Sequence, residues 1–116
     1  MRHRKQKFTL GREKAARTAL IKNLAESLIL HGSIKTTEAK AKALRTYVEP
    51  LVTKARKNTL AARRLVISKL FTEEAVKKLM EEVGPKYVER DGGYTRIIKL
   101  ENRKNDGAPI VKIEFV

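Results

Sequence analysis

Basic side chains at the start of the chain are the residues best suited to chemistry here, and that chemistry is the binding of phosphate groups. Arginine presents a planar fork that engages two phosphate oxygens, and lysine supplies a mobile point charge. Nothing apolar separates Met1 from Phe8, so this segment cannot bury enough surface to fold alone. We predict a basic arm over residues 1–8 that contacts a nucleic-acid backbone, with a solubilising tail as the alternative. Its candidate contacts are Arg2, His3, Arg4, Lys5 and Lys7.

Three further groups of cations follow along the chain, and a solvated surface is the alternative for each. The first group begins a predicted helix, whose free backbone N–H groups also suit phosphate oxygens. The second joins a lysine to hydroxyl groups just before another helix. The third contains arginines spaced by seven residues, which predicts a shared helical face. In order, the groups are Arg12, Lys14 and Arg17; Lys35 and Thr36; and Arg56, Arg63 and Arg64.

A glycine pair near the C-terminal end forms a fourth candidate contact. Gly92 and Gly93 allow a backbone to approach a ligand closely. Tyr94 and Arg96, two residues apart on a predicted strand, would offer a surface for base stacking beside a cation. A plain loop with Tyr94 in the core is the alternative.

No residue pattern in the sequence indicates catalysis. The chain has no cysteine and only two histidines, which excludes thiol chemistry and a plausible zinc site. No serine, histidine and acid grouping and no glycine-rich phosphate loop is present. We therefore predict no enzyme activity, no metal, no cofactor and no small-molecule substrate.

The charge distribution points to a polyanionic partner. The net charge is +14, and residues 1–69 account for all of it with 18 basic and four acidic side chains, whereas residues 70–116 carry nine of each. A solvated surface does not need such an excess, which costs self-repulsion. Nucleic acid is preferred over an anionic membrane because no lipid-inserting helix is evident. Composition alone also permits a free DNA-binding architectural protein.

A folded domain must position these cations, and a chain of 116 residues has the length of a single domain. We predict an α+β fold with two layers, in which helices pack on a small mixed sheet, and a single globular domain over residues 9–116. The expected order is a helix over 10–31, a strand over 33–37, helices over 38–57, 60–70 and 72–83, and a hairpin with strands over 94–100 and 111–115.

Local signals set these boundaries. Gly32 suits a left-handed helix end, and Thr37 suits a helix N-cap. Pro50 predicts a kink rather than an end, since the apolar phase continues beyond it. Gly84 followed by Pro85 predicts the end of the fourth helix.

Five motifs, in order along essentially the whole chain, resemble one family. They are Met1-Arg2-His3-Arg4-Lys5, Leu10-Gly11-Arg12, His31-Gly32-Ser33-Ile34-Lys35-Thr36-Thr37 with Lys40-Ala41-Lys42, Arg63-Arg64-Leu65, and Gly92-Gly93-Tyr94-Thr95-Arg96-Ile97. The chain is similar to the bacterial large-subunit ribosomal protein conventionally numbered seventeen.

The resemblance implies a structural protein of the large ribosomal subunit in the cytoplasm. It implies binding to 23S rRNA near the exit of the peptide tunnel, with a role in subunit assembly and translation. It also implies a two-layer α/β fold and contact with a neighbouring small ribosomal protein, number thirty-two.

Overall fold

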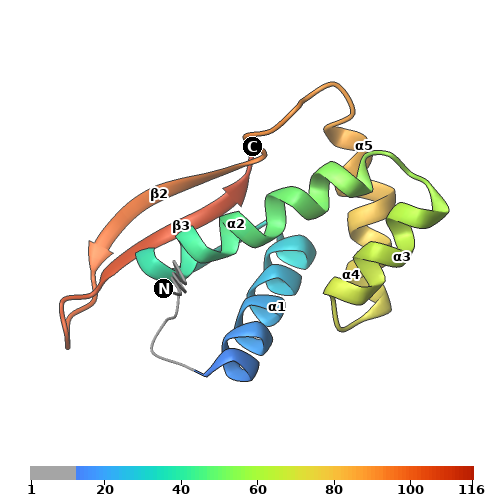
Figure 1. The fold of residues 1–116 in the computed structure, drawn as a ribbon. Helices are drawn as coiled ribbons and strands as arrows, with labels where there is room; N and C mark the ends of the chain where they lie inside the picture. Colours follow the sequence, from blue (N-terminus) through green and yellow to red (C-terminus); the bar gives the residue numbers. More distant parts are fainter. Residues whose placement is uncertain (1–12) are drawn as a thin grey trace, which may run out of the picture.

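The computed structural model describes residues 13–116, so the predicted arm and Arg12 lie outside the described residues. The α+β class is confirmed, and the order of helices and strands follows the prediction (Figure 1). The elements are α1 (Lys14–His31), β1 (Ser33–Thr37), α2 (Glu38–Ala55), α3 (Leu60–Lys69), α4 (Glu73–Lys78), the π-helical turn η1 (Leu79–Val83), α5 (Gly84–Lys86), β2 (Thr95–Asn102) and β3 (Pro109–Phe115).

The sheet has the order β1-β3-β2, and both of its strand pairs are antiparallel. The prediction of a mixed sheet is therefore wrong. A short turn containing Gly107, at φ 69°, joins β2 to β3 and fixes them as an antiparallel hairpin. The β1 strand then pairs in the antiparallel sense with the free edge of β3.

The core lies between one face of this sheet and the helices, with α2 at its centre. The predicted apolar stripe of α2 is confirmed, because Ala41, Leu44, Val48, Leu51 and Ala55 are all buried. Figure 1 shows α2 running beside the sheet at one end and reaching the α3–α5 group at the other. The first turns of α1 project from the body, and most of their residues are exposed.

Side-chain caps and a glycine set the helix boundaries largely as predicted. The hydroxyl of Thr37 accepts a hydrogen bond from the Lys40 backbone N–H at 3.4 Å. Gly32 ends α1 in the left-handed conformation, at φ 81°. The α2 helix continues through Pro50, as its apolar phase predicts.

Gly84 and Pro85 do not end the fourth helix, which contradicts the prediction. The chain passes from α4 through the π turn η1 into α5, which includes both residues. Proline normally breaks a helix because its ring meets the carbonyl four residues earlier. The wider π turn just before Pro85 relieves that conflict, so the helical path continues to Lys86.

Candidate nucleic-acid interface

The cations of α1 lie on its projecting first turns. Lys14 is exposed and Arg17 is half-buried. The N-cap residue Glu13 makes no side-chain cap hydrogen bond, so its carboxylate does not close the start of the helix. The backbone N–H groups of the first turn of α1 are therefore not capped by the Glu13 side chain, and the exposed Lys14 lies beside them.

The shared helical face predicted for Arg56 and Arg63 does not exist. Arg56 follows the end of α2, whereas Arg63 belongs to α3, and Asn58 turns the chain between them at φ 50°. The seven-residue spacing has meaning only within one continuous helix. Arg64 is exposed on α3, and Arg63 is half-buried beside a cleft.

The Arg56 side chain makes intramolecular contacts that stabilise the fold and is not free to bind a phosphate. Its guanidinium donates to the carbonyl of Arg90 and lies 3.2 Å from Asp91 Oδ1. The side chain is only 19% exposed. Arg56 therefore ties the end of α2 to the loop that precedes β2.

The stacking role predicted for Tyr94 is wrong, because its side chain is 0% exposed. Its hydroxyl lies 3.0 Å from Thr53 Oγ1 and donates to the Arg90 carbonyl at 3.1 Å. Its ring packs 5.2 Å from the ring of Tyr87. The core thus satisfies both ends of this amphipathic side chain, and no ring face is left for a base.

The two glycines of the loop differ in their backbone requirements. Gly93 has φ 62°, a conformation that favours glycine, whereas Gly92 has no positive φ. A Cβ added at either position would meet nothing within 4 Å. The loop backbone is therefore open to an approaching ligand at both positions.

Among the described elements, the helices pack on one face of the sheet, and cations gather on the other face. Arg96 and Glu114 are Cα partners on this face, and Lys35 lies opposite Lys112 in the next row. Thr36 points to the helix-covered side, because side chains alternate along a strand, so it does not share the open face with Lys35. Sequence reasoning missed Lys112, although its alternation with buried Val111 and Ile113 could have identified it.

Glu114 is the acidic member of this open face. Its carboxylate accepts a hydrogen bond from Arg96 Nε at 2.8 Å and lies 3.6 Å from Lys112 Nζ. The hydrogen bond from Arg96, together with the nearby positive charges, lowers the pKa of Glu114 below its ordinary value. The carboxylate therefore stays ionised at neutral pH and offsets part of the positive charge.

A buried carboxylate, missed from the sequence, positions the connection between α3 and α4. Glu26 of α1 is 8% exposed, and its Oε2 accepts hydrogen bonds from the backbone N–H groups of Phe71 and Thr72, the latter at 2.7 Å. An acidic residue within the apolar half of a helix is the signal that could have found it. Glu26 thereby fixes the start of α4 against α1.

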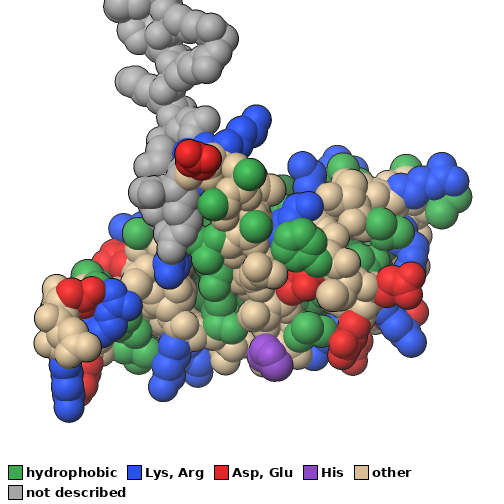
Figure 2. Space-filling view, turned by 90° about the horizontal axis from the view of Figure 1, so that it is seen from below, with side chains coloured by type: hydrophobic (Ala, Val, Ile, Leu, Met, Phe, Trp, Pro, Cys, Tyr) green, Lys and Arg blue, Asp and Glu red, His purple; other side chains and the backbone are tan. Residues whose placement is uncertain are grey.

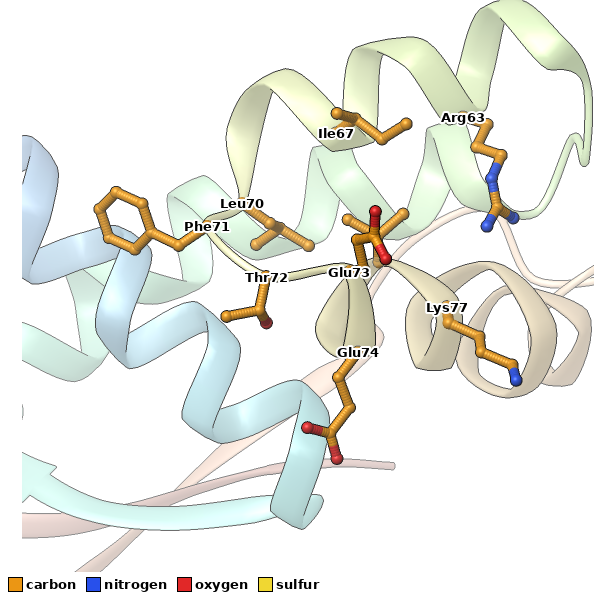
Figure 3. Close-up of a pocket in the computed structure, with 9 residues that line it drawn as sticks. Arg63, Ile67, Leu70, Phe71, Thr72, Glu73, Glu74 and Lys77 are labelled. Carbon is orange, nitrogen blue, oxygen red and sulfur yellow. The ribbon is translucent and has the colours of Figure 1, made fainter.

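A cleft of about 590 Å³ lies between α3 and α4 (Figure 3). Leu70 and Val76 form its apolar floor, and Ile67 is 53% exposed above them. Figure 3 shows Arg63 on α3 and Glu73, Glu74 and Lys77 on α4 around this floor.

Phe71 also lines this cleft, and its ring lies on the side of α1 (Figure 3). It is 54% exposed, and Lys22 Nζ lies 4.9 Å from its centroid.

Seen from below, apolar side chains gather across the middle of the molecule, while lysines and arginines project at both ends (Figure 2).

Residues 13–116 contain no group of three His, Cys, Asp or Glu side chains that could hold a metal ion. Within the same part of the chain, no helix is long and apolar enough to cross a membrane. Fold and surface together define a small basic α+β protein whose cations are displayed around a packed core, a class typical of nucleic-acid-binding structural proteins.

Comparison with known proteins identifies the family within this class. Residues 20–116 match the family model described as ribosomal protein L17. A relative named large ribosomal subunit protein bL17, from Gemmatimonas aurantiaca, is 53% identical over 116 residues, covering 100% of this chain and 98% of its own length. The protein of that name from Sulfurimonas denitrificans is also 53% identical, with 100% of each chain covered.

The chain belongs to the ribosomal protein L17 family, a family of large-subunit ribosomal proteins and not of enzymes. The resemblance noted from the five sequence motifs is thereby confirmed.

Proposed function

We propose that this chain is a structural constituent of the large ribosomal subunit that binds 23S rRNA mainly through phosphate contacts. The observation that carries the proposal is the excess of basic over acidic side chains in residues 1–69, 18 against four. Among the described residues, ion pairs engage the basic side chains of Lys42, Arg56, Arg96, Arg103 and Lys112. Most other cations of this region face solvent and can neutralise RNA phosphates.

The proposed contacts combine several regions of the chain. The basic arm and Arg12 are carried forward from the sequence. Lys14 and Arg17 on α1, the exposed Arg64, and the loop at Gly92 and Gly93 support them within residues 13–116. Arg56 and Tyr94 are excluded, because the fold uses both side chains internally.

We expect the affinity for a 23S rRNA transcript to fall steeply and linearly with salt on a double-logarithmic plot. Each neutralised phosphate contributes a slope of roughly 0.7–0.9, and six to ten contacts reduce affinity by roughly 10³–10⁵-fold between 50 and 200 mM salt. Filter binding across a salt series measures this slope. Affinity that barely changes over that range would contradict a phosphate-based mechanism.

A free DNA-binding architectural protein is the rival, and cell fractionation separates the two. We expect the chain to sediment with large ribosomal subunits and to stay with them after DNase treatment. Sedimentation with DNase-sensitive material would favour the rival.

The α3–α4 cleft supports contact with a protein, for which we propose the neighbouring small ribosomal protein number thirty-two. The cleft joins an apolar floor to the exposed side chain of Ile67. An RNA backbone would meet the carboxylates of Glu73 and Glu74 there, which disfavours it. A protein can bury the apolar surface and pair with charges of both signs.

Replacing Ile67 by serine should weaken binding of purified protein thirty-two by about 1–2 kcal/mol, since a central apolar contact is lost. Isothermal titration calorimetry measures the change. Val88→Ser is the matched control, because Val88 is similarly exposed, at 57%, but lies outside the cleft. Equal effects of the two substitutions would show that the cleft is not the contact surface.

A further inference from the structure

Two lysines lie directly opposite each other on the face of the sheet that the helices leave open. Lys35 of β1 and Lys112 of β3 are Cα partners, and Ile98 of β2 continues their row. In the adjacent row, Ile34 and Ile113 pack in the core. Because side chains alternate along a strand, both lysines project from the opposite, open face. We call this pair the Lys35–Lys112 row.

This arrangement is unfavourable within the free protein. The Cβ atoms of directly opposed residues in an antiparallel pair lie about 4.5–5.5 Å apart, and like charges at that separation destabilise the pairing. Sheet proteins commonly place opposite charges or apolar pairs at such positions. The row therefore favours a ligand that supplies negative charge.

The fold compensates only one of the two lysines. Glu114 lies 3.6 Å from Lys112 Nζ, but it also accepts a hydrogen bond from Arg96. No carboxylate within residues 13–116 forms an ion pair with Lys35. The Glu114 carboxylate thus pairs with both Arg96 and Lys112, and the exposed Lys35 has no ion-pair partner among the described carboxylates.

The open face suits a chain of phosphates better than a single small anion. It is a sheet surface rather than a pocket, and its cations are distributed over all three strands, with Arg96 on β2, Lys112 on β3 and Lys35 on β1. The β-strand backbone holds their Cα atoms in fixed register before any ligand arrives. An extended polyanion can meet several of these cations at once.

We propose that the Lys35–Lys112 row binds phosphate groups of the rRNA backbone, which lies across the open face of the sheet. The inference rests on the proposed binding of 23S rRNA and adds a specific contact surface on the folded body. A phosphate oxygen between the two ammonium groups replaces their repulsion by two charge-assisted hydrogen bonds.

Lys35→Glu gives the sharpest test, because stability and binding should change in opposite directions. The introduced carboxylate faces Lys112, so repulsion becomes attraction and the melting temperature of the free protein should not fall. Binding to a 23S rRNA transcript at low salt should weaken, and the salt slope should shrink by at least one contact, roughly 0.7–0.9. A loss of both stability and binding would mean that Lys35 supports the fold, which would overturn the proposal.

Two double variants that each replace two lysines by glutamine distinguish the effect of the Lys35–Lys112 row from the effect of net charge. Lys35→Gln with Lys112→Gln should reduce the salt slope by roughly 1.4–1.8, the value for two contacts. The matched control is Lys99→Gln with Lys104→Gln, which removes two exposed charges from the same hairpin but outside the row. The control should reduce the slope by clearly less.

The remaining outcomes are distinguishable. Equal reductions by both double variants would attribute the effect to net charge and overturn the row as a site. An unchanged slope for the row variant, with a steep slope for the unmodified protein, would overturn the row and leave the proposed function intact. Salt-independent binding by the unmodified protein would overturn the proposed function, and the row would fall with it.

Discussion

Deleting residues 1–7 is expected to reduce the salt slope for 23S rRNA by roughly 3 while leaving the melting temperature nearly unchanged. The deletion removes four cations, Arg2, Arg4, Lys5 and Lys7, and each phosphate contact contributes roughly 0.7–0.9 to the slope. The segment holds no apolar residue besides Met1, so we expect its loss to take nothing from the core. The affinity loss should be largest at low salt and fade as salt screens the charges.

A full-length variant with glutamine at the same four positions is the matched control. It keeps the chain and removes only the charge, so it should reproduce most of the change in slope. Circular dichroism melts and salt-titrated filter binding measure both properties. An unchanged slope in the deleted protein would make the segment a passive tail, and a large fall in melting temperature would make it part of the fold.

Signals that act over a few residues predicted most of the fold. The start of α2 follows from the Thr37 cap, the end of α1 follows from Gly32, and the burial of α2 follows from its apolar period. In the two caps the deciding hydrogen bond spans at most four residues, so the sequence contains their complete cause. The alternation of Val111 and Ile113 with polar residues likewise predicted a half-buried strand.

Candidate site residues were harder to predict, because the competing roles depend on distant partners. The ring of Tyr94 suits a base or a core equally well, and its hydroxyl partner Thr53 lies 41 residues away. Arg56 pairs with Asp91, 35 residues along the chain. Lys35 and Lys112 become neighbours only through strand register. Sequence spacing identified cations, but tertiary contacts decide which of them face solvent.

Gly84 illustrates the same limit on the fold and leads to the prediction with the largest expected effect on stability. A Cβ at this position would lie 2.9 Å from both the carbonyl carbon and the oxygen of Ala55 in α2. These are backbone atoms of a buried helix, so they cannot move aside as a flexible side chain would. Gly84 therefore permits the close contact of α5 with α2. In the sequence, the Pro85 that follows made Gly84 look like the end of a helix instead.

Gly84→Ala should lower the free energy of unfolding by about 2 kcal/mol, the usual cost of overpacking, and the melting temperature by roughly 10 °C. Alanine's better helix propensity offsets part of the strain, by at most about 1 kcal/mol. Thermal melts should show the largest loss of stability for Gly84→Ala, a smaller loss for Gly93→Ala and the smallest for Gly92→Ala. Gly92→Ala, with open space and no positive φ, should be nearly neutral, and Gly93→Ala, at φ 62°, should cost about 1 kcal/mol.

The salt slope for rRNA should stay unchanged in Gly84→Ala below its melting transition, since no charge is altered. Ala55→Gly should fail to rescue the variant, because the clash involves the backbone of Ala55 and not its methyl group. Rescue by Ala55→Gly would place the strain in side-chain packing instead. A Gly84→Ala protein that melts at or above the unmodified temperature would show that α5 can move away from α2 at little cost.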